Sequence, residues 1–271
     1  MITITTHCGT FHADEVTAVA LLAVFKDSKF KVSRVQHQTT EFDTDYVLDI
    51  GRQYDPTTHK FDHHQWHSSD DGRSSAGLIW DHLQDTLVVK RGSFPGIDKF
   101  IKAVDANDVG IKPALPMEYS RLLGNYNHSD IHSKKQDKQF KKAVKFAKTM
   151  IKSMVQSQQA QDATEKAIKY GQTVLGHPNV LELPEYLQGW GKFVNGETMP
   201  KIHAIMYPDK KLDTWNIQTT QVNTESYDKV GKAFPTTSDV PMEFIHKDGF
   251  FAVAKTRSDA VDFLYEWNRK G

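Results

Sequence analysis

The sequence of 271 residues contains one cysteine, no long apolar run and no net charge. A single thiol, Cys8, excludes an intramolecular disulfide framework and favours a reducing compartment. No segment approaches the roughly 18 consecutive apolar residues of a membrane helix, so we expect no membrane association. Because 34 Lys and Arg balance 34 Asp and Glu, binding to nucleic acid through bulk charge is excluded, whereas a local basic groove is not.

The first residues of the sequence lack both a basic stretch and an apolar core. We therefore expect no signal or transit peptide and predict a cytoplasmic location. The oligomeric state stays open, with a dimer as one alternative. What the sequence does have is 13 histidines, and they are unevenly distributed along the chain.

Strand and helix patterns alternate over the first hundred residues. The expected strands are residues 2–6, 31–36, 46–51 and 60–63, and the expected helices are residues 15–26, 74–89 and 95–104. This alternation predicts an α/β fold whose sheet is largely parallel.

The rest of the chain has a different pattern. Residues 134–170 have the periodicity of one long helix or two in series. Strand-like runs follow at 202–207, 215–222 and 250–255, and a helix is expected at 258–269, where Thr256 and Asp259 have capping-box spacing. We predict a domain at 1–130, a helical linker at 131–176 and a smaller α+β domain at 177–271.

Residues that commonly bind metal ions occur in four segments, three at expected strand ends and one at a helix end. Their candidate ligands are His7, His12 and Asp14; Asp49; Asp62, His63 and His64; and Asp105. Because ligands of open α/β sheets gather beyond the carboxyl ends of the strands, these distant segments can converge on one pocket.

Mixed imidazole and carboxylate ligands indicate which metals could bind. Without thiolate clusters, they suit Mn²⁺, Mg²⁺, Co²⁺, Fe²⁺ or a catalytic Zn²⁺. Two ions about 3.5–4 Å apart, sharing a carboxylate, would use all the ligands and favour phosphoester hydrolysis. Taken singly, Asp49 and Asp105 are more typical of turn or helix-end residues, and the His63-His64 pair can occur by chance. The joint occurrence of four segments favours metal.

Several short motifs follow one another in an order found in a known family. In chain order they are His7-x-Gly9-Thr10-Phe11-His12-x-Asp14-Glu15, Asp49-Ile50-Gly51, Tyr54-Asp55-Pro56, Lys60-Phe61-Asp62-His63-His64-Gln65, Ser74-Ser75-Ala76-Gly77, Val104-Asp105-Ala106, Trp215-x-x-Gln218 and His246-x-x-Gly249-Phe250. This set resembles the MYG family (melanocyte proliferating gene product-like) of the DHH phosphoesterase superfamily.

The resemblance implies a DHH-type catalytic domain at residues 1–130 and a substrate-binding domain at 177–271. It implies a divalent-metal phosphodiesterase, most typically a 3′–5′ exonuclease on RNA or short single-stranded oligonucleotides. Hydrolysis would proceed by attack of a metal-activated hydroxide on the phosphate, with two ions, Mn²⁺ or else Mg²⁺.

The resemblance also implies residue roles. Three residues, His7, His12 and Asp14, would hold metal, Asp49 would bridge two ions, and His63 and Asp105 would complete the second site. Catalytic roles fall to His64, which would contact or protonate the scissile phosphate, and to Asp62, which would orient the His pair. The expected substrate-binding residues are His246 and Gly249 from the resemblance. Lys255 and Arg257 are added because they lie at a strand-to-helix junction, where the start of a helix could help to bind a terminal phosphate.

Two departures from the family pattern leave alternatives open. Cys8 stands where asparagine is usual, and Ala252-Val253 replaces an expected glycine pair in the substrate-binding loop. The sequence therefore leaves open the physiological substrate, RNA versus DNA, and the metal used in the cell. The alternatives are a phosphatase of the same type acting on pyrophosphate, a cyclic dinucleotide or a nucleoside bisphosphate, and a non-catalytic nucleotide-binding protein.

The long helical segment has two stripes of side chains. One is basic (Lys134, Lys138, Lys141, Lys145, Lys148 and Lys152) and the adjacent one is apolar (Phe140, Val144, Ala147 and Ile151). The lysines suit either a track for the phosphates of a single strand or an ordinary solvated face.

Overall fold

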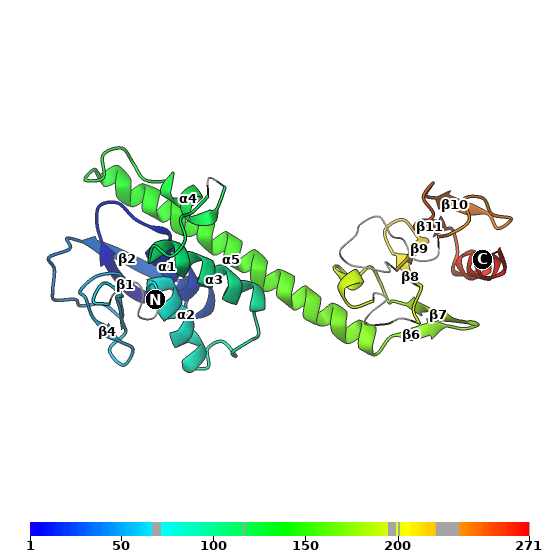
Figure 1. Ribbon diagram of the computed structural model, residues 1–271, viewed down its shortest axis with the longest axis horizontal. Helices are drawn as coiled ribbons and strands as arrows, with labels where there is room; N and C mark the ends of the chain where they lie inside the picture. The colour runs from blue at the N-terminus through cyan, green and yellow to red at the C-terminus, as the bar shows by residue number, and fades with distance from the viewer. Residues whose placement is uncertain (67–71, 116, 195–198, 200, 221–232, 271) are drawn as a thin grey trace. The chain divides into compact units, whose positions relative to one another are not determined.

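The chain forms two compact units, Met1–Gln158 and Gln159–Gly271. The computed structural model describes residues 1–66, 72–115, 117–194, 199, 201–220 and 233–270 (Figure 1). The two units divide within one long helix, α5 (Lys134–Lys169), which contributes residues to the cores of both. Of the two expected alternatives, one long helix or two in series, the structure has the single helix.

A five-stranded sheet organises the first unit. Its strands are β1 (Ile2–His7), β2 (Phe30–Val35), β3 (Tyr46–Leu48), β4 (Tyr54–Asp55) and β5 (Lys60–Phe61). In the order β2-β1-β3-β5-β4, all pairs are parallel except β4 with β5. The helices are α1 (Ala13–Phe25), α2 (Ser75–Asp85), α3 (Pro95–Asp108), α4 (Tyr119–Gly124) and α5. The predicted α/β class with a largely parallel sheet is confirmed.

Burial explains how the elements of the first unit assemble. Every residue of α1 from Ala13 to Ala23 is buried, which is typical of a helix enclosed by other elements. The predicted apolar stripe of α5 is buried in the same core, where the ring of Phe140 packs edge-on against Phe11 at 5.4 Å between centroids. Because β1, β3 and β5 are parallel, their carboxyl ends meet at one edge of the sheet.

Helix α3 extends further than its sequence pattern predicts. It begins at Pro95, whose fixed φ suits the first helical turn, and continues to Asp108 instead of ending near residue 104. Asp105 and Asp108 consequently lie on the last turn of one helix, three residues apart and close in space.

The second unit is an α+β arrangement, as predicted. Its sheet has the order β10-β11-β9-β8-β7-β6 and is antiparallel except for β7 with β8. The elements are β6 (Gln172–Val174), β7 (His177–Glu182), η1 (Trp190–Lys192), β8 (Ala204–Asp209), β9 (Thr214–Thr219), β10 (Met242–Ile245), β11 (Phe251–Ala254) and α6 (Arg257–Lys270). The strand expected at 215–222 ends at Thr219, and residues 221–222 lie outside the described residues.

Helix α6 begins with the predicted capping box. Asp259 accepts hydrogen bonds from the Thr256 hydroxyl and backbone N–H, and its own N–H donates to the Thr256 oxygen. Phe263, Leu264 and Trp267 then bury this helix in the core of the second unit.

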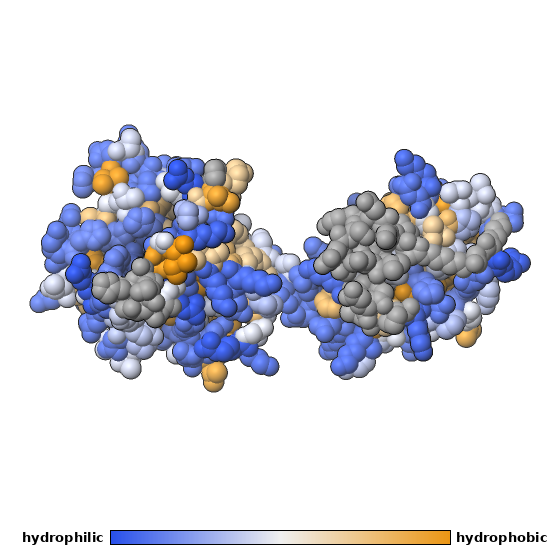
Figure 2. Space-filling model, in the orientation of Figure 1, coloured by the Kyte–Doolittle hydropathy of each residue, from blue (hydrophilic) through white to orange (hydrophobic). Residues whose placement is uncertain are grey.

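Polar side chains dominate the visible surface of each unit, and apolar surface is confined to separate patches (Figure 2). No helix of the described residues combines the length and the apolar composition that crossing a membrane requires.

His177, at the start of β7, is a fully buried histidine with one unpaired nitrogen. The Asn268 side-chain amide donates to His177 Nδ1 at 3.0 Å, so Nε2 carries the proton, and Nε2 has no partner among the described residues. Burial lowers the pKa of His177. As the pH falls below the ordinary histidine value of about 6.5, the unfolded chain takes up a proton that the folded unit resists, so stability is lost there.

Replacing His177 by glutamine is expected to reduce this acid sensitivity. Between about pH 7.5 and about pH 5, the variant should lose less unfolding free energy than the wild type, because glutamine does not titrate. Denaturant unfolding at the two pH values measures the difference. Equal losses in the two proteins would contradict the assignment.

Candidate metal centre

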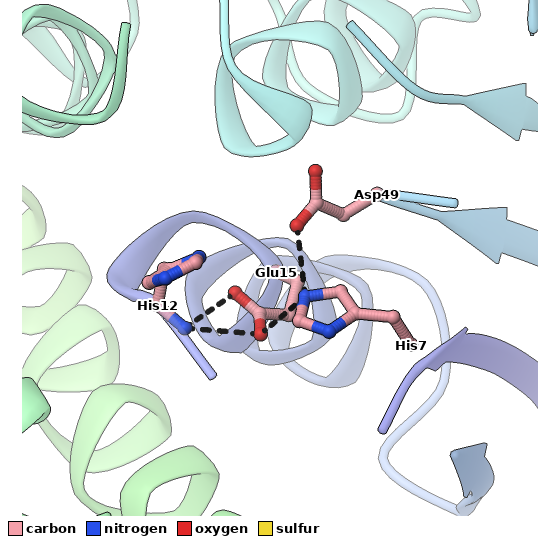
Figure 3. Close-up of side chains that lie close together, drawn as sticks. All are labelled: His7, His12, Glu15 and Asp49. Carbon is pink, nitrogen blue, oxygen red and sulfur yellow. Dashed lines mark hydrogen bonds and ion pairs between the residues drawn. The ribbon is translucent and has the colours of Figure 1, made fainter. Parts of the chain in front are cut away.

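His7 is buried between two carboxylates at the end of β1. Its Nε2 atom lies 3.2 Å from Glu15 Oε1 and 3.2 Å from Asp49 Oδ2 (Figure 3). The other nitrogen, Nδ1, donates to the Cys8 carbonyl at 2.9 Å. Although burial opposes it, hydrogen bonding to Asp49 and Glu15 raises the pKa of His7 to about 11. The ring is thereby oriented with Nε2 toward the acidic groups.

Asp49 lies directly after β3 and faces three imidazoles. Its Oδ2 is close to His7, while Oδ1 lies 3.3 Å from His63 Nε2 and 3.4 Å from His64 Nδ1. Burial disfavours its charge, but hydrogen bonds from His63 and His7 hold the pKa of Asp49 well below its usual range. This carboxylate is therefore ionised and shared between the two histidine segments.

Asp14, on the first turn of α1, is a fully buried carboxylate. Neither of its oxygens has a hydrogen-bond partner among the described residues, and the nearest histidine nitrogen, His63 Nε2, is 3.9 Å away. Burial raises the pKa of Asp14, and the negative charges of Asp108, Asp49 and Glu15 raise it further. An unpaired buried carboxylate is costly, and a cation bound beside it would offset that cost.

The ligand atoms fall into three groups, and the atoms within each group lie within 4.8 Å of one another. The groups are His7, His12, Glu15 and Asp49; Asp49, His63 and His64; and His12, Asp14 and Asp108. The first two share Asp49, and the first and third share His12. Together with the orphaned oxygens of Asp14, this set of nitrogen and oxygen ligands fits divalent cations.

The sequence analysis missed Glu15 and Asp108. Glu15 holds the start of α1, since both its oxygens accept from the His12 backbone N–H at 3.0 Å (Figure 3). Asp108 Oδ2 lies 3.1 Å from His63 Nε2. Glu15 ends the first motif and Asp108 lies two residues after the Val104-Asp105-Ala106 motif, so their carboxylates were the available signal.

Asp105 lies apart from the three groups, although the sequence analysis expected it to bind metal. Its Oδ1 accepts hydrogen bonds from the Ser74 N–H, the Ser74 hydroxyl and the Gly77 N–H, and its Oδ2 pairs with Arg73 at 2.9 Å. These contacts cap the amino terminus of α2. Within the described residues, Asp108 instead supplies the carboxylate of α3 that faces His63.

Gly77 permits this contact between α2 and α3. A Cβ atom at Gly77 would lie 2.5 Å from both carboxylate oxygens of Asp105. We expect Gly77→Ala to lower the unfolding free energy by about 1–3 kcal/mol, because Asp105 must move. Gly96→Ala is the matched helical control, since its Cβ would meet only Met154 Cε, at 3.9 Å. Chemical denaturation measures both, and an equal or smaller loss in Gly77→Ala would contradict the prediction.

Asp62 and His64 form a hydrogen-bonded pair beside the ligand groups. Asp62 Oδ1 accepts from His64 Nδ1 at 2.8 Å and from the His64 N–H at 3.0 Å, and Oδ2 accepts from the Arg52 N–H. The hydrogen bond to Asp62 raises the pKa of His64, whose side chain is about half exposed. Asp62 thus orients a solvent-accessible imidazole.

The loop between β1 and α1 is held by residues distant in sequence. Gly9 O accepts hydrogen bonds from Gln136 Nε2 and Arg34 Nη2, each at 2.8 Å. The Asn127 amide bonds to both the N–H and the carbonyl of Phe11. These contacts fix the backbone next to His12.

The substrate-binding residues expected in the second unit lie at two places. His246 and Gly249 belong to the turn between β10 and β11, where the His246 ring packs on Phe250 at 4.1 Å and Gly249 has a φ of +67°. Lys255 is exposed after β11. Arg257 makes two hydrogen bonds to Glu182, of 3.0 and 2.6 Å, so its charge is already paired.

Comparison with known proteins identifies relatives over nearly the whole chain. The human MYG1 exonuclease is 26% identical over 317 residues, covering 94% of this chain and 83% of the human protein. The MYG1 protein of Saccharomyces cerevisiae is 27% identical over 316 residues, covering 94% and 92%. The MYG1 protein of Chlamydia muridarum is 36% identical over 107 residues, covering 39% and 37%.

A family profile extends this similarity and confirms the resemblance found in the motifs. The matching family is described as an uncharacterised protein family, UPF0160, under the heading MYG1 exonuclease, and the match spans residues 3–265. It includes all the segments that supply the ligand groups as well as the second unit up to residue 265. The chain therefore belongs to the MYG1 family.

Proposed function

We propose that this protein is a divalent-metal-dependent phosphodiesterase, a 3′–5′ exonuclease acting on RNA or other short single-stranded oligonucleotides. The position of Asp49 carries the proposal: one buried carboxylate lies within 3.4 Å of nitrogens from His7, His63 and His64 and belongs to two ligand groups. The exonuclease names of several relatives also support it.

The residues that would hold metal are those of the three ligand groups except His64, whose Nδ1 is hydrogen-bonded to Asp62. Asp49 is the shared ligand, and Asp108 replaces Asp105 in the set because α2 occupies the Asp105 carboxylate. When bound, a pair of divalent ions, Mn²⁺ or Mg²⁺, activates water near neutral pH and neutralises charge on the phosphate. The buried acids orient the imidazoles for this task.

His64 is proposed to transfer a proton. Asp62 accepts the Nδ1–H of His64, which leaves Nε2 facing away from the carboxylate on a half-exposed ring. Because the same contact raises the pKa of His64, the ring can donate from Nε2 to the departing oxygen of the phosphodiester.

The second unit is proposed to bind the substrate chain. His246 and Lys255 offer hydrogen-bond donors, and Gly249 lets the Phe234 backbone pack against the turn that carries His246. A phosphate at Arg257 would compete with Glu182 for the guanidinium. The Ala252 side chain is fully buried in β11, so the replaced glycine position serves the core of this unit.

The test combines metal analysis with assays on end-labelled oligonucleotides. We expect bound divalent metal, stepwise shortening of single strands from the 3′ end, loss of activity in EDTA and recovery with Mn²⁺. Hydrolysis confined to pyrophosphate or cyclic dinucleotides would indicate a small-substrate phosphatase. Tight nucleotide binding without products would indicate a binding protein, and absence of metal binding would contradict the proposal.

A further inference from the structure

A cavity of about 500 Å³ adjoins the ligand groups within the first unit. Its lining includes His12 and Asp108, both members of the third ligand group, together with Ser120, Arg121 and Asn125. A volume of this size lies within the roughly 300–1,000 Å³ of small-ligand sites. The cavity therefore has room for a part of the substrate beside the reacting phosphate.

The polar side chains that line the cavity from α4 and from the residue after it have no partner among the described residues. Among the described residues, no hydrogen bond or ion pair occupies the side chains of Ser120, Arg121 or Asn125. Arg121 is the only Lys or Arg residue of the described lining. Asp108 is the only acidic residue there, and its carboxylate already faces His63. An arginine with no acidic partner, flanked by a hydroxyl and an amide, suits a phosphate group.

The lining has no exposed face of a large aromatic side chain, among the described residues, on which a nucleobase could stack. Its one large aromatic residue, Phe11, is 1% exposed and packs against Phe140 and the Arg34 guanidinium, so its ring face is covered. Base recognition on single strands depends on exposed aromatic faces. The cavity is therefore better suited to the charged sugar–phosphate chain than to a stacked base.

The wall of the cavity is fixed in place. Asn127, also in the lining, uses its amide to hold Phe11 and accepts from Gln136 Nε2 at 2.5 Å. Phe11, the residue before His12, is thereby tied to the turn that follows α4, 116 residues later in the sequence. The backbone next to α4 is therefore held close to His12, which suits recognition of a phosphate at a set spacing from the ligand groups.

We propose that this cavity binds a second, non-reacting phosphate of an oligonucleotide, with Arg121 as its main contact and Ser120 and Asn125 as hydrogen-bond donors. The inference rests on the proposed function and deepens it, because it makes a chain of at least two phosphates the preferred substrate. Hydrolysis of a mononucleotide or of pyrophosphate would not place a second, non-reacting phosphate of a nucleotide chain in this cavity.

The experiment compares a trinucleotide, which has two phosphates, with a dinucleoside monophosphate, which has one. Binding is measured by calorimetry in Ca²⁺, with chromatography afterwards to verify that no product forms, and KM is measured in Mn²⁺. We expect Arg121→Gln to weaken trinucleotide binding by about 10-fold and to leave the single-phosphate ligand within about twofold. Arg121→Lys should recover part of the loss.

A neutral methylphosphonate at the non-reacting linkage supplies the second half of the test. The methylphosphonate should weaken binding to the wild type. It should not weaken binding to Arg121→Gln any further, because the two changes remove the same contact. Arg91→Gln is the matched control, since Arg91 is exposed and pairs with Asp85 outside the cavity. Thermal unfolding verifies that all variants fold.

Several results would overturn the inference. Wild-type affinity of Arg121→Gln for both ligands would exclude the contact, and equal losses for both would place Arg121 at the reacting phosphate. A loss that depends on the base instead of the phosphate charge would assign the cavity to a nucleobase. If the wild type neither bound nor cleaved any oligonucleotide, the proposed function itself would be contradicted. If it hydrolysed oligonucleotides but the Arg121 substitution had no effect, only the inference about the cavity would be contradicted.

Discussion

Replacing Asp49 by asparagine is expected to lower phosphodiester hydrolysis by more than about 100-fold and to reduce the bound metal. Removing even the hydrogen-bond partner of a ligand costs about 10–100-fold in metal affinity or activity, and Asp49 is proposed to be a ligand shared by two ions. An amide lacks the charge that holds the imidazoles of His7 and His63, and only one of its two atoms accepts hydrogen bonds. Steady-state kinetics and metal analysis measure the two losses.

Asparagine is a better probe at this position than alanine. Asp49 has a φ of 55°, a left-handed conformation that asparagine adopts readily and alanine disfavours. The control is Asp85→Asn, which neutralises an exposed carboxylate paired with Arg91 and should leave activity unchanged. Near-normal turnover in a folded Asp49→Asn protein would remove the central support for the metal centre.

The convergence of the site could be predicted from the sequence because it depends on strand direction. His7 and Asp49 end or follow strands whose order along the chain alternates with helices, and such strands run parallel. Parallel strands present their carboxyl ends at one edge, so residues more than forty positions apart meet there. Strand boundaries did not need to be correct for this inference.

The exact set of acidic residues could not be predicted in the same way. Choosing between Asp105 and Asp108 requires the end of α3, and helix ends are the least certain feature of a sequence pattern. It also requires knowing that α2 needs a cap and that Gly77 leaves room for one. These are contacts between elements, which local periodicity does not encode.

The pairing of Arg257 illustrates the same limit. Its place at the start of α6 suggested a phosphate contact, but Glu182 on β7, 75 residues earlier, occupies the guanidinium. In contrast, Arg121 lies in a segment with no distinctive sequence pattern, and its proposed role depends on the cavity and on its lack of a partner among the described residues.

The buried carboxylate of Asp14 opposes folding unless a cation is present. Asp14, Glu15 and Asp49 are all at most 2% exposed, and their charges repel one another. Functional sites commonly retain such unfavourable groups at the expense of stability. The metal-free and metal-bound proteins should therefore respond differently when one of these charges is removed.

Asp14→Asn is accordingly expected to stabilise the metal-free protein and to weaken the stabilisation that added metal provides. Without metal, the variant should gain about 1–3 kcal/mol of unfolding free energy, because it removes an ionisable buried group with no hydrogen-bond donor. With Mn²⁺ at about 100 times the dissociation constant, the wild type should gain about 2.7 kcal/mol, and the variant should gain much less. Thermal and denaturant unfolding in EDTA and in Mn²⁺ measure the four values, with Asp85→Asn as the exposed control. If Asp14→Asn were instead destabilised in EDTA and stabilised by Mn²⁺ as strongly as the wild type, Asp14 would be a structural carboxylate and the third ligand group would lose its central member.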